Sequence, residues 1–277
     1  MARQDTSIQV AFQGEHGAYS EEAAYAFFHE PITTQPCTTI KEVFRAVEAS
    51  IVRFGVVPVE NSLEGTINQT HDLLLQSALQ ISGEVKIKIN HCLLVLPGVK
   101  LSDISKVYSH PQALAQCGGF LDAMHTSAEP AYDTAGSAKM ISERGLRDAA
   151  AIAGERAAAL YGLDILQREI EDDSENYTRF LVVGKNDAPP TGMDKTSIVF
   201  GTMHKPGSLQ KALNELAIRG INLTKIESRP IKGTPWEYHF FVDFEGHRND
   251  KPCSEALQAL RNSTTFLKML GSYPRSD

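Results

Sequence analysis

The chain lacks the patterns that carry several common kinds of chemistry. Its glycine segments have neither the three spaced glycines of a dinucleotide-binding turn nor the Gly-Lys-Ser/Thr of a phosphate-binding loop. No Gly-x-Ser-x-Gly appears, and the nine histidines show no two-His-plus-carboxylate spacing on one helix. Nucleotide binding, covalent acyl transfer and metal-assisted hydrolysis are therefore not indicated, and we expect no cofactor and no metal.

Excess positive charge, close cysteine pairs and long apolar runs are also missing. The 27 Lys and Arg against 34 Asp and Glu give a net charge of −7, which disfavours nucleic-acid partners because their binding depends on phosphate neutralisation. The four cysteines are scattered, so we expect buried free thiols. Without a membrane-length apolar stretch or a signal-peptide pattern, we expect a cytoplasmic protein with no membrane partner.

The 277 residues, of which 42% are hydrophobic, are enough for two domains with substantial cores. Through the first 185 residues, short apolar runs alternate with helical patterns, which predicts parallel sheet with crossover helices. We expect strands at Ile8 to Phe12 and Phe54 to Val59, and a helix from Ser20 to Phe28. Thr39 and Glu42 fit a capping box before the next helix.

From about residue 81 the pattern changes, and a second lobe is expected to begin there. Val85 to Asn90 alternates, and His91 to Leu96 is mostly apolar, as in a strand that enters a core. Lys106 to His110 is typical of a strand, and Pro111 suits the first turn of a helix.

Polar residues gather where several predicted strands end. Glu60, Asn61 and Ser62 follow the strand at residues 54–59, and Thr66 comes before the next helix. Ligands in open α/β sheets bind beyond the carboxyl ends of the strands, so this cluster and the glycine loop at residues 14–17 are candidate ligand contacts. Thr134 precedes another predicted helix, where helix capping is an equally good interpretation.

The segment Asn176 to Phe180 combines an amide, two hydroxyls and a permanent cation at the start of an apolar run. Arg179 presents a planar fork that matches a carboxylate, with Thr178 and Asn176 beside it. The pattern fits a small-anion site, although periodicity alone favours a strand with an alternating polar face.

A compact module begins near residue 196. Strand and helix patterns follow one another in the order βαββαβ, the ferredoxin-like arrangement. Gly207 stands at the start of its first helix, and Gly220 stands just after that helix. The stretch Asp187 to Gly192 is rich in proline and turn residues and is expected to be a linker.

At this point the motifs resemble a known family. Gly14 to Ser20, Gly55 to Gly65, His110 to Leu114 and Asn176 to Phe180 resemble the corresponding segments of prephenate dehydratases. Gly207-Ser208-Leu209 and Glu227-Ser228-Arg229-Pro230, the latter placed after the second strand of the module, resemble an ACT domain that binds phenylalanine. The resemblance covers almost the whole chain, although Glu15 replaces a usual proline and Ala18, Ser208 and Gln210 also depart from the family pattern.

The resemblance implies a two-lobed catalytic domain, similar to a periplasmic binding protein, followed by a ferredoxin-like ACT domain. The catalytic domain is expected at residues 1–185, with lobe 1 at about 7–80 and 171–185 and lobe 2 at about 81–170. The linker is expected at residues 186–195 and the ACT domain at residues 196–277.

The implied reaction in phenylalanine biosynthesis converts prephenate to phenylpyruvate with loss of carbon dioxide and water. Thr178 is the family's catalytic position, and we expect it to donate to the leaving hydroxyl or to relay a proton from Glu60, His110 or water. We assign Arg179 to the pyruvyl carboxylate, because a cation on the departing carboxylate would stabilise the ground state. The implied substrate contacts are Glu60, Asn61, Ser62, Thr66, His110, Gln112, Thr134, Asn176, Tyr177 and Phe180, the last packing beneath the site.

The implied effector is phenylalanine, bound where two ACT domains pair, so at least a homodimer or a dimer of dimers is expected. Arg229 is expected either to contact the effector or to pair with Glu227. Two alternatives to the prephenate reaction are an arogenate dehydratase and a non-catalytic amino-acid sensor. The implied effector contacts are Gly207, Ser208, Leu209, Asn222, Leu223, Glu227, Ser228 and Arg229.

Overall fold

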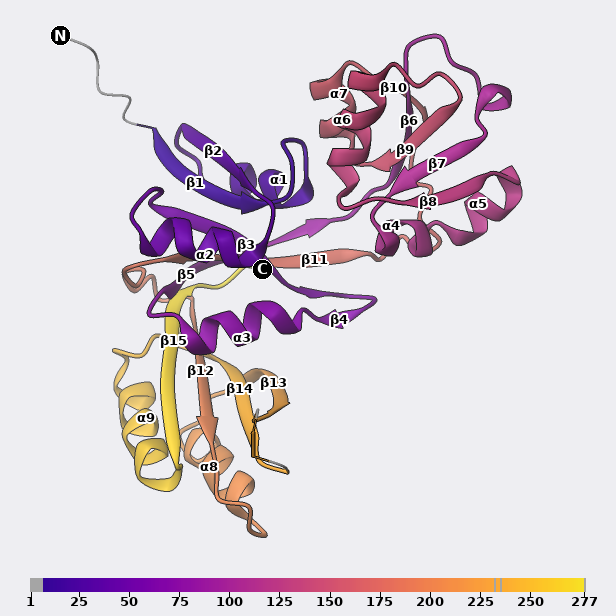
Figure 1. Ribbon diagram of the computed structural model, residues 1–277. Helices are drawn as coiled ribbons and strands as arrows, with labels where there is room; N and C mark the ends of the chain where they lie inside the picture. Colours follow the sequence, from indigo (N-terminus) through magenta and orange to yellow (C-terminus); the bar gives the residue numbers. More distant parts are fainter. Residues whose placement is uncertain (1–6, 232, 235, 277) are drawn as a thin grey trace, which may run out of the picture. The chain divides into compact units, whose positions relative to one another are not determined.

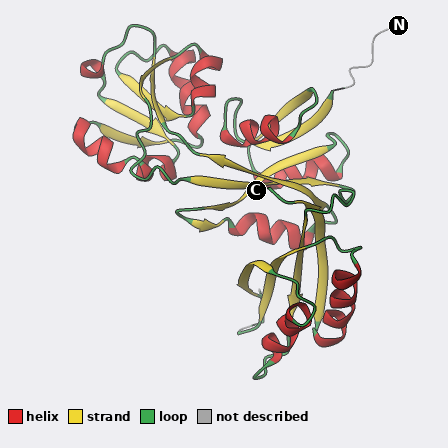
Figure 2. Cartoon of the chain, turned by 180° about the vertical axis from the view of Figure 1, so that it is seen from behind, coloured by secondary structure: helices red, strands yellow, loops and turns green. Residues whose placement is uncertain are grey.

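The computed structural model describes residues 7–231, 233–234 and 236–276, which form three β-sheets accompanied by helices (Figures 1 and 2). The first sheet has the order β2-β1-β3-β11-β5, with β4 paired to β3. Its strands are β1 (Ile8–Gln13), β2 (Ile32–Cys37), β3 (Phe54–Asn61), β4 (Gly65–Thr66), β5 (Gln80–Lys88) and β11 (Tyr177–Gly184). Its helices are α1 (Tyr19–Phe27), α2 (Ile40–Glu48) and α3 (Asn68–Gln76).

Helix α2 shows why these local sequences fold as they do. Its apolar side chains recur at helical spacing, and Ile40, Val43 and Phe44 are buried. The Thr39 hydroxyl caps the helix by accepting from the Glu42 amide at 3.2 Å. The Glu42 carboxylate accepts from the Thr38 amide at 2.9 Å, so the reciprocal half of the expected capping box binds one residue earlier.

The second sheet has the order β10-β6-β9-β7-β8. Its strands are β6 (Cys92–Val95), β7 (Lys106–Ser109), β8 (Ser127–Pro130), β9 (Ala149–Ala153) and β10 (Asp164–Gln167). Its helices are α4 (Pro111–Gln116), α5 (Gly118–Met124), α6 (Thr134–Arg144) and α7 (Glu155–Tyr161), with a short 3₁₀ helix at Leu101–Asp103. Both sheets contain parallel and antiparallel pairs, because returning strands join the parallel strands expected from the sequence.

Strand β9 is buried on both faces of the second sheet. Its alternate residues Ala149, Ala151 and Ala153 join one core cluster, whereas Ala150 and Ile152 join another. Small side chains at this central position let helices pack against both faces.

Two neighbouring segments of the chain, one after β5 and one before β11, connect the two lobes. The boundary between the lobes differs from the expected one. Strand β5 pairs within the first sheet, so the second lobe begins after Lys88 and not at about residue 81. Alternation along residues 85–90 is the same whichever sheet accepts the strand, which is why the sequence placed it wrongly. Between the lobes, the Ile89 amide donates to the Asn176 carbonyl at 2.8 Å.

The third sheet is antiparallel with the order β13-β14-β12-β15, which confirms the βαββαβ module. Glu227 to Pro230 lie inside β13, not after it as expected, because pairing with β14 extends to Tyr238. Ile198, Phe200, Val242 and Phe244 pack with the two helices in one core. Its elements are β12 (Asp194–Gly201), α8 (Ser208–Ala217), β13 (Leu223–Pro230), β14 (Tyr238–Glu245), α9 (Lys251–Ser263) and β15 (Phe266–Pro274).

The chain divides into two compact units that cut across this order. The first contains Met1–Thr70 and Val85–Phe180, and the second contains His71–Glu84 and Leu181–Asp277. Most of α3 and the start of β5 therefore belong with the C-terminal module. The boundaries at residues 185 and 196 stay predictions.

Two further expectations concern the cysteines and the membrane. Cys37, Cys92, Cys117 and Cys253 are all buried and free, as expected. Among the described residues, no helix combines the length and the apolar character needed to cross a membrane.

Candidate active site

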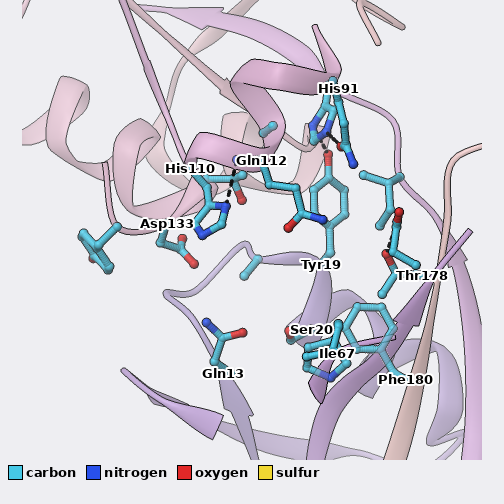
Figure 3. A pocket seen from close by; sticks show the side chains of 18 residues that line it. Gln13, Tyr19, Ser20, Ile67, His91, His110, Gln112, Asp133, Thr178 and Phe180 are labelled. Carbon is cyan, nitrogen blue, oxygen red and sulfur yellow. Dashed lines mark hydrogen bonds between the residues drawn. The ribbon is translucent and has the colours of Figure 1, made fainter. Parts of the chain in front are cut away.

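A cavity in the first compact unit lies at the carboxyl ends of β1, β3, β7 and β8 and against β11 (Figure 3). This is where a ligand is expected in α/β sheets, because the loops that follow the strands converge there. The cavity is lined by Gln13, Ala18, Tyr19, Ser20, Pro58, Asn61, Ile67, Ile89, His91, His110, Gln112, Ala113, Gln116, Tyr132, Asp133, Thr134, Thr178 and Phe180.

The side-chain amide of Asn61 fixes the Thr178 hydroxyl. Asn61 Oδ1 accepts from the amides of Leu63 and Glu64 at 3.0 and 3.1 Å, so the orientation of its amide group is set by two backbone donors. Asn61 Nδ2 is thereby directed at Thr178 Oγ1, 3.0 Å away. Since the Thr178 oxygen accepts this hydrogen bond, the hydroxyl proton is free to be donated elsewhere.

A series of buried and half-buried polar side chains, joined by hydrogen bonds, extends from Asn61 to the second lobe. Asn61 Nδ2 also donates to Asn176 Oδ1 at 2.8 Å, and Asn176 Nδ2 donates to Gln116 Oε1 at 3.0 Å. Gln116 Oε1 lies 3.0 Å from Nε2 of His91, whose Nδ1 lies 3.1 Å from the Tyr19 hydroxyl. Burial lowers the pKa of His91, which favours the neutral ring. These hydrogen-bonded side chains link both lobes to Asn61, which orients Thr178.

His110 and Asp133 lie near one another on another side of the cavity (Figure 3). His110 Nδ1 accepts from the Gln112 amide at 3.3 Å, so the neutral ring carries its proton on Nε2. Burial raises the pKa of Asp133, although its Oδ1 caps α6 by accepting from the Gly136 amide at 2.7 Å. The pair supplies a possible proton source that does not require Thr178 to ionise.

Among the described residues, no lysine or arginine lines this cavity. Helices α1, α4 and α6 begin at the cavity, and His110 and Asp133 cap α4 and α6, which leaves the N-terminus of α1 as the end without a side-chain cap. Ala18, at the N-cap of α1, provides no side-chain cap, so the first-turn amides have no acceptor from that side chain. An uncapped helix end of this kind suits an anionic ligand without placing a full charge against it.

The residues expected from the sequence fall into two groups. The cavity brings together Asn61, His110, Gln112, Thr134, Thr178 and Phe180. It does not include Glu60, Ser62, Thr66, Asn176, Tyr177 or Arg179 among its lining residues. Ser62 joins β3 to the segment before β11, since its hydroxyl donates to the Glu175 carbonyl at 2.8 Å and accepts from the Tyr177 amide at 2.9 Å.

The side chains of Arg179 and Thr178 lie on opposite faces of β11, because successive strand residues point to opposite faces. Thr178 and Phe180 line the cavity, whereas the Arg179 guanidinium lies 3.8 Å from the Glu60 carboxylate. The structure therefore does not bring Arg179 into the cavity with Thr178.

Several lining residues were not expected from the sequence. Gln116 follows Gln112 by one helical turn, and this spacing on α4 is a signal that could have found it. Asp133 could have been found as the N-cap residue beside Thr134. His91 had no comparable signal, because it precedes a buried strand whose other residues are apolar.

The C-terminal module has a groove of its own at the start of α8. Gly207 there has a φ of 79°, a conformation suited to glycine, and a Cβ would meet nothing within 4 Å. The expected effector residues Gly207, Ser208 and Leu209 line the groove, whereas Asn222, Leu223, Glu227, Ser228 and Arg229 do not. Arg229 pairs with Asp72 at 3.0 Å.

The fold and the cavity define a class first: a two-lobed α/β enzyme followed by a βαββαβ regulatory module. The family model of prephenate dehydratase matches residues 10–188, and that of the ACT domain matches residues 196–262. The chain therefore belongs to the prephenate dehydratase family, which confirms the resemblance in its motifs.

Individual proteins agree with this family. The chain is 46% identical to arogenate dehydratase/prephenate dehydratase 2 of Arabidopsis thaliana, over 96% of this chain and 73% of that protein. It is 45% identical to the bifunctional chorismate mutase/prephenate dehydratase of Aquifex aeolicus, over 98% and 75%. The crystal structure of prephenate dehydratase from Arthrobacter aurescens in complex with L-Phe matches with a TM-score of 0.88 at 34% identity, over 97% and 90%.

Proposed function

We propose that the cavity around Thr178 converts prephenate to phenylpyruvate. The observation that carries this proposal is the Asn61 amide directed at Thr178 Oγ1, in a chain of the prephenate dehydratase family. The ring carboxylate leaves as carbon dioxide, and its bonding electrons enter the ring. The C4–oxygen bond breaks, and the departing oxygen takes up a proton to become water.

Thr178 assists the departing oxygen by donating its hydroxyl hydrogen. Because Asn61 donates to the Thr178 oxygen, the hydroxyl hydrogen is left for the substrate, and Thr178 acts as a donor toward the departing oxygen. Thr178 is a weak acid, so the net proton comes from a stronger one. The carboxyl of Asp133, whose pKa is raised by burial and which lies beside His110, is the proposed source, since both residues line the cavity and Glu60 does not.

The cavity suits a dianion that must lose one of its carboxylates. A lysine or arginine on the ring carboxylate would stabilise a charge that disappears in the transition state. The N-terminus of α1 and neutral donors from Gln13, Gln112 and Thr134 hold the charge of the carboxylate less strongly, so they raise the barrier to decarboxylation less.

The role of Arg179 at the pyruvyl carboxylate stays a prediction. If its guanidinium binds that carboxylate, Arg179→Lys raises KM for prephenate about 10-fold or more, because a bidentate contact is lost. Steady-state kinetics measure the change. A variant with normal affinity and impaired turnover would show that Arg179 acts on the reaction through Glu60 or the strand instead.

The choice between prephenate and arogenate is tested with both substrates. We expect phenylpyruvate formation from prephenate with a higher kcat/KM than phenylalanine formation from arogenate. Each substrate is tested with and without added phenylalanine. A reversed preference would make the chain an arogenate dehydratase, as the name of the Arabidopsis relative allows. No product from either substrate would favour a sensor.

We propose that phenylalanine binds the groove at the start of α8 and inhibits the reaction. First-turn amides near Gly207 and Ser208 would take its carboxylate, and Asn222 and Leu223 of a neighbouring copy would close the site. Support comes from the Arthrobacter protein, which is described in complex with L-Phe. We also propose that the protein forms a homodimer or a dimer of dimers. We propose a cytoplasmic location as well. Inhibition requires a coupling of about 1–3 kcal/mol between the two sites.

A further inference from the structure

Helix α3 begins beside the cavity. Ile67, which precedes the helix, lines the cavity, and its amide donates to the Val59 carbonyl at 2.9 Å. One turn later, the Thr70 hydroxyl donates at 2.6 Å to the carbonyl of Pro58, another lining residue. The start of α3 is therefore hydrogen-bonded to the wall of the active site.

The other end of α3 belongs to the second compact unit and is held by Lys268 of β15. Lys268 Nζ donates to the carbonyls of Leu74, Leu75 and Ser77 at 2.9, 2.8 and 2.5 Å. The last turn of a helix leaves such carbonyls without intrahelical donors, and a cation there also complements the helix dipole. A single ammonium thus ties the end of α3 to the edge strand of the module.

Two other strands of the module contact the same helix. Arg229 of β13 pairs with Asp72 at 3.0 Å, and Phe241 of β14 meets His71 edge-on at 4.7 Å between ring centroids. Together with Lys268, these contacts attach three of the module's four strands to α3. Nine residues of helix are about 13 Å long at 1.5 Å per residue, short enough to move as a rigid rod.

We propose that α3 carries the inhibitory signal from the ACT domain to the active site, with Lys268 as the positioning residue that connects the helix to the module. A displacement of β15 moves the end of α3, and the rigid helix transmits the movement to Ile67 and Thr70. The cavity wall at Pro58 then shifts. This inference rests on the proposed regulation by phenylalanine and names its route.

The test separates effector binding from inhibition. In Lys268→Met, which keeps the length of the side chain and removes its donors, we expect phenylalanine to bind with a Kd within 3-fold of the original. Its inhibition of kcat/KM should fall to less than 2-fold, compared with the roughly 5- to 150-fold typical of allosteric coupling. Lys268→Arg, which keeps the donors, should restore most of the inhibition. Lys251→Met, at an exposed position on α9, is the matched control and should behave like the original chain.

Asp72→Asn provides a second variant if Lys268→Met does not fold. It removes the charge opposite Arg229 while leaving the backbone of α3 intact, and we expect it to reduce inhibition at least 3-fold with the Kd for phenylalanine unchanged. Titration calorimetry gives the Kd, and initial rates give the inhibition. Full inhibition in a folded Lys268→Met, or in Asp72→Asn if that variant alone folds, overturns the proposal. Loss of phenylalanine binding in step with inhibition overturns it as well.

Failure of the proposed function is visible separately. If the original chain forms no phenylpyruvate, or forms it without inhibition by phenylalanine, the function or its regulation is wrong and not the route through α3. Reciprocity adds an independent readout, because linked sites alter each other's affinity equally. In a Thr178→Ala background, which retains prephenate, prephenate should weaken phenylalanine binding, and Lys268→Met should abolish that effect.

Discussion

Replacing Thr178 with alanine is expected to lower kcat about 10²- to 10⁴-fold, the usual contribution of a positioned proton donor. Asn61 holds the Thr178 oxygen at 3.0 Å and leaves the hydroxyl hydrogen for the departing oxygen of prephenate. Alanine removes this donor without creating a large void, because Thr178 lies at the cavity wall. Phenylpyruvate formation gives kcat, and calorimetry with prephenate gives the substrate affinity, which should change less than 5-fold.

Thr178→Ser is the matched control. Serine keeps the oxygen that accepts from Asn61 and the hydrogen that serves the leaving group, so we expect kcat within about 10-fold of the original. Near-normal turnover in Thr178→Ala would remove Thr178 from the mechanism. A common large loss in both variants would indicate that the methyl group, through packing, matters more than the hydroxyl.

Replacing Lys195 with methionine is expected to destabilise the second compact unit by about 3–5 kcal/mol, which is the typical cost of removing one partner of a buried ion pair. Lys195 Nζ lies 2.7 Å from Glu84 Oε1, and the Glu84 side chain has 0% of its surface exposed. The amide of Ser276 also donates to Glu84 Oε1 at 3.0 Å, but it brings no positive charge. Urea denaturation followed by circular dichroism measures the loss.

Two controls separate charge from packing in this experiment. The double variant Lys195→Met with Glu84→Gln removes both charges and should recover most of the lost stability. Arg168→Met breaks a pair whose side chains are 59% and 58% exposed, and it should leave the denaturation midpoint nearly unchanged. If Lys195→Met is as stable as the original chain, other partners of Glu84 compensate for its buried charge. If the double variant is no better than the single one, packing explains the loss.

Much of the active site could be predicted from local patterns. Asn61 and His110 follow apolar runs recognisable as strands, and the carboxyl ends of strands are where α/β folds bind ligands. The order of the C-terminal strands and helices likewise follows from periodicity alone, because each element alternates or repeats within its own few residues. These features depend on neighbours along the chain.

Other features depend on neighbours in space. Alternation in Gln80–Lys88 identifies a strand but not the sheet that accepts it, and the second lobe accordingly starts later than expected. Gln116 and His91 look ordinary in the sequence, and they gain a role only through the hydrogen bonds that lead to Asn61. Arg229, expected at the effector or beside Glu227, is paired with Asp72, 157 residues away.

The sequence by itself determined the family and the reaction and predicts a catalytic role for Thr178, because each rests on short motifs whose residues are adjacent. Only the tertiary structure decided how Thr178 is oriented, since the donor comes from a residue 117 positions earlier. It also placed Arg179 outside the cavity and joined Lys268 to α3 across 191 to 194 positions. Hydrogen bonds and ion pairs act over about 3 Å, and only folding brings such distant residues that close.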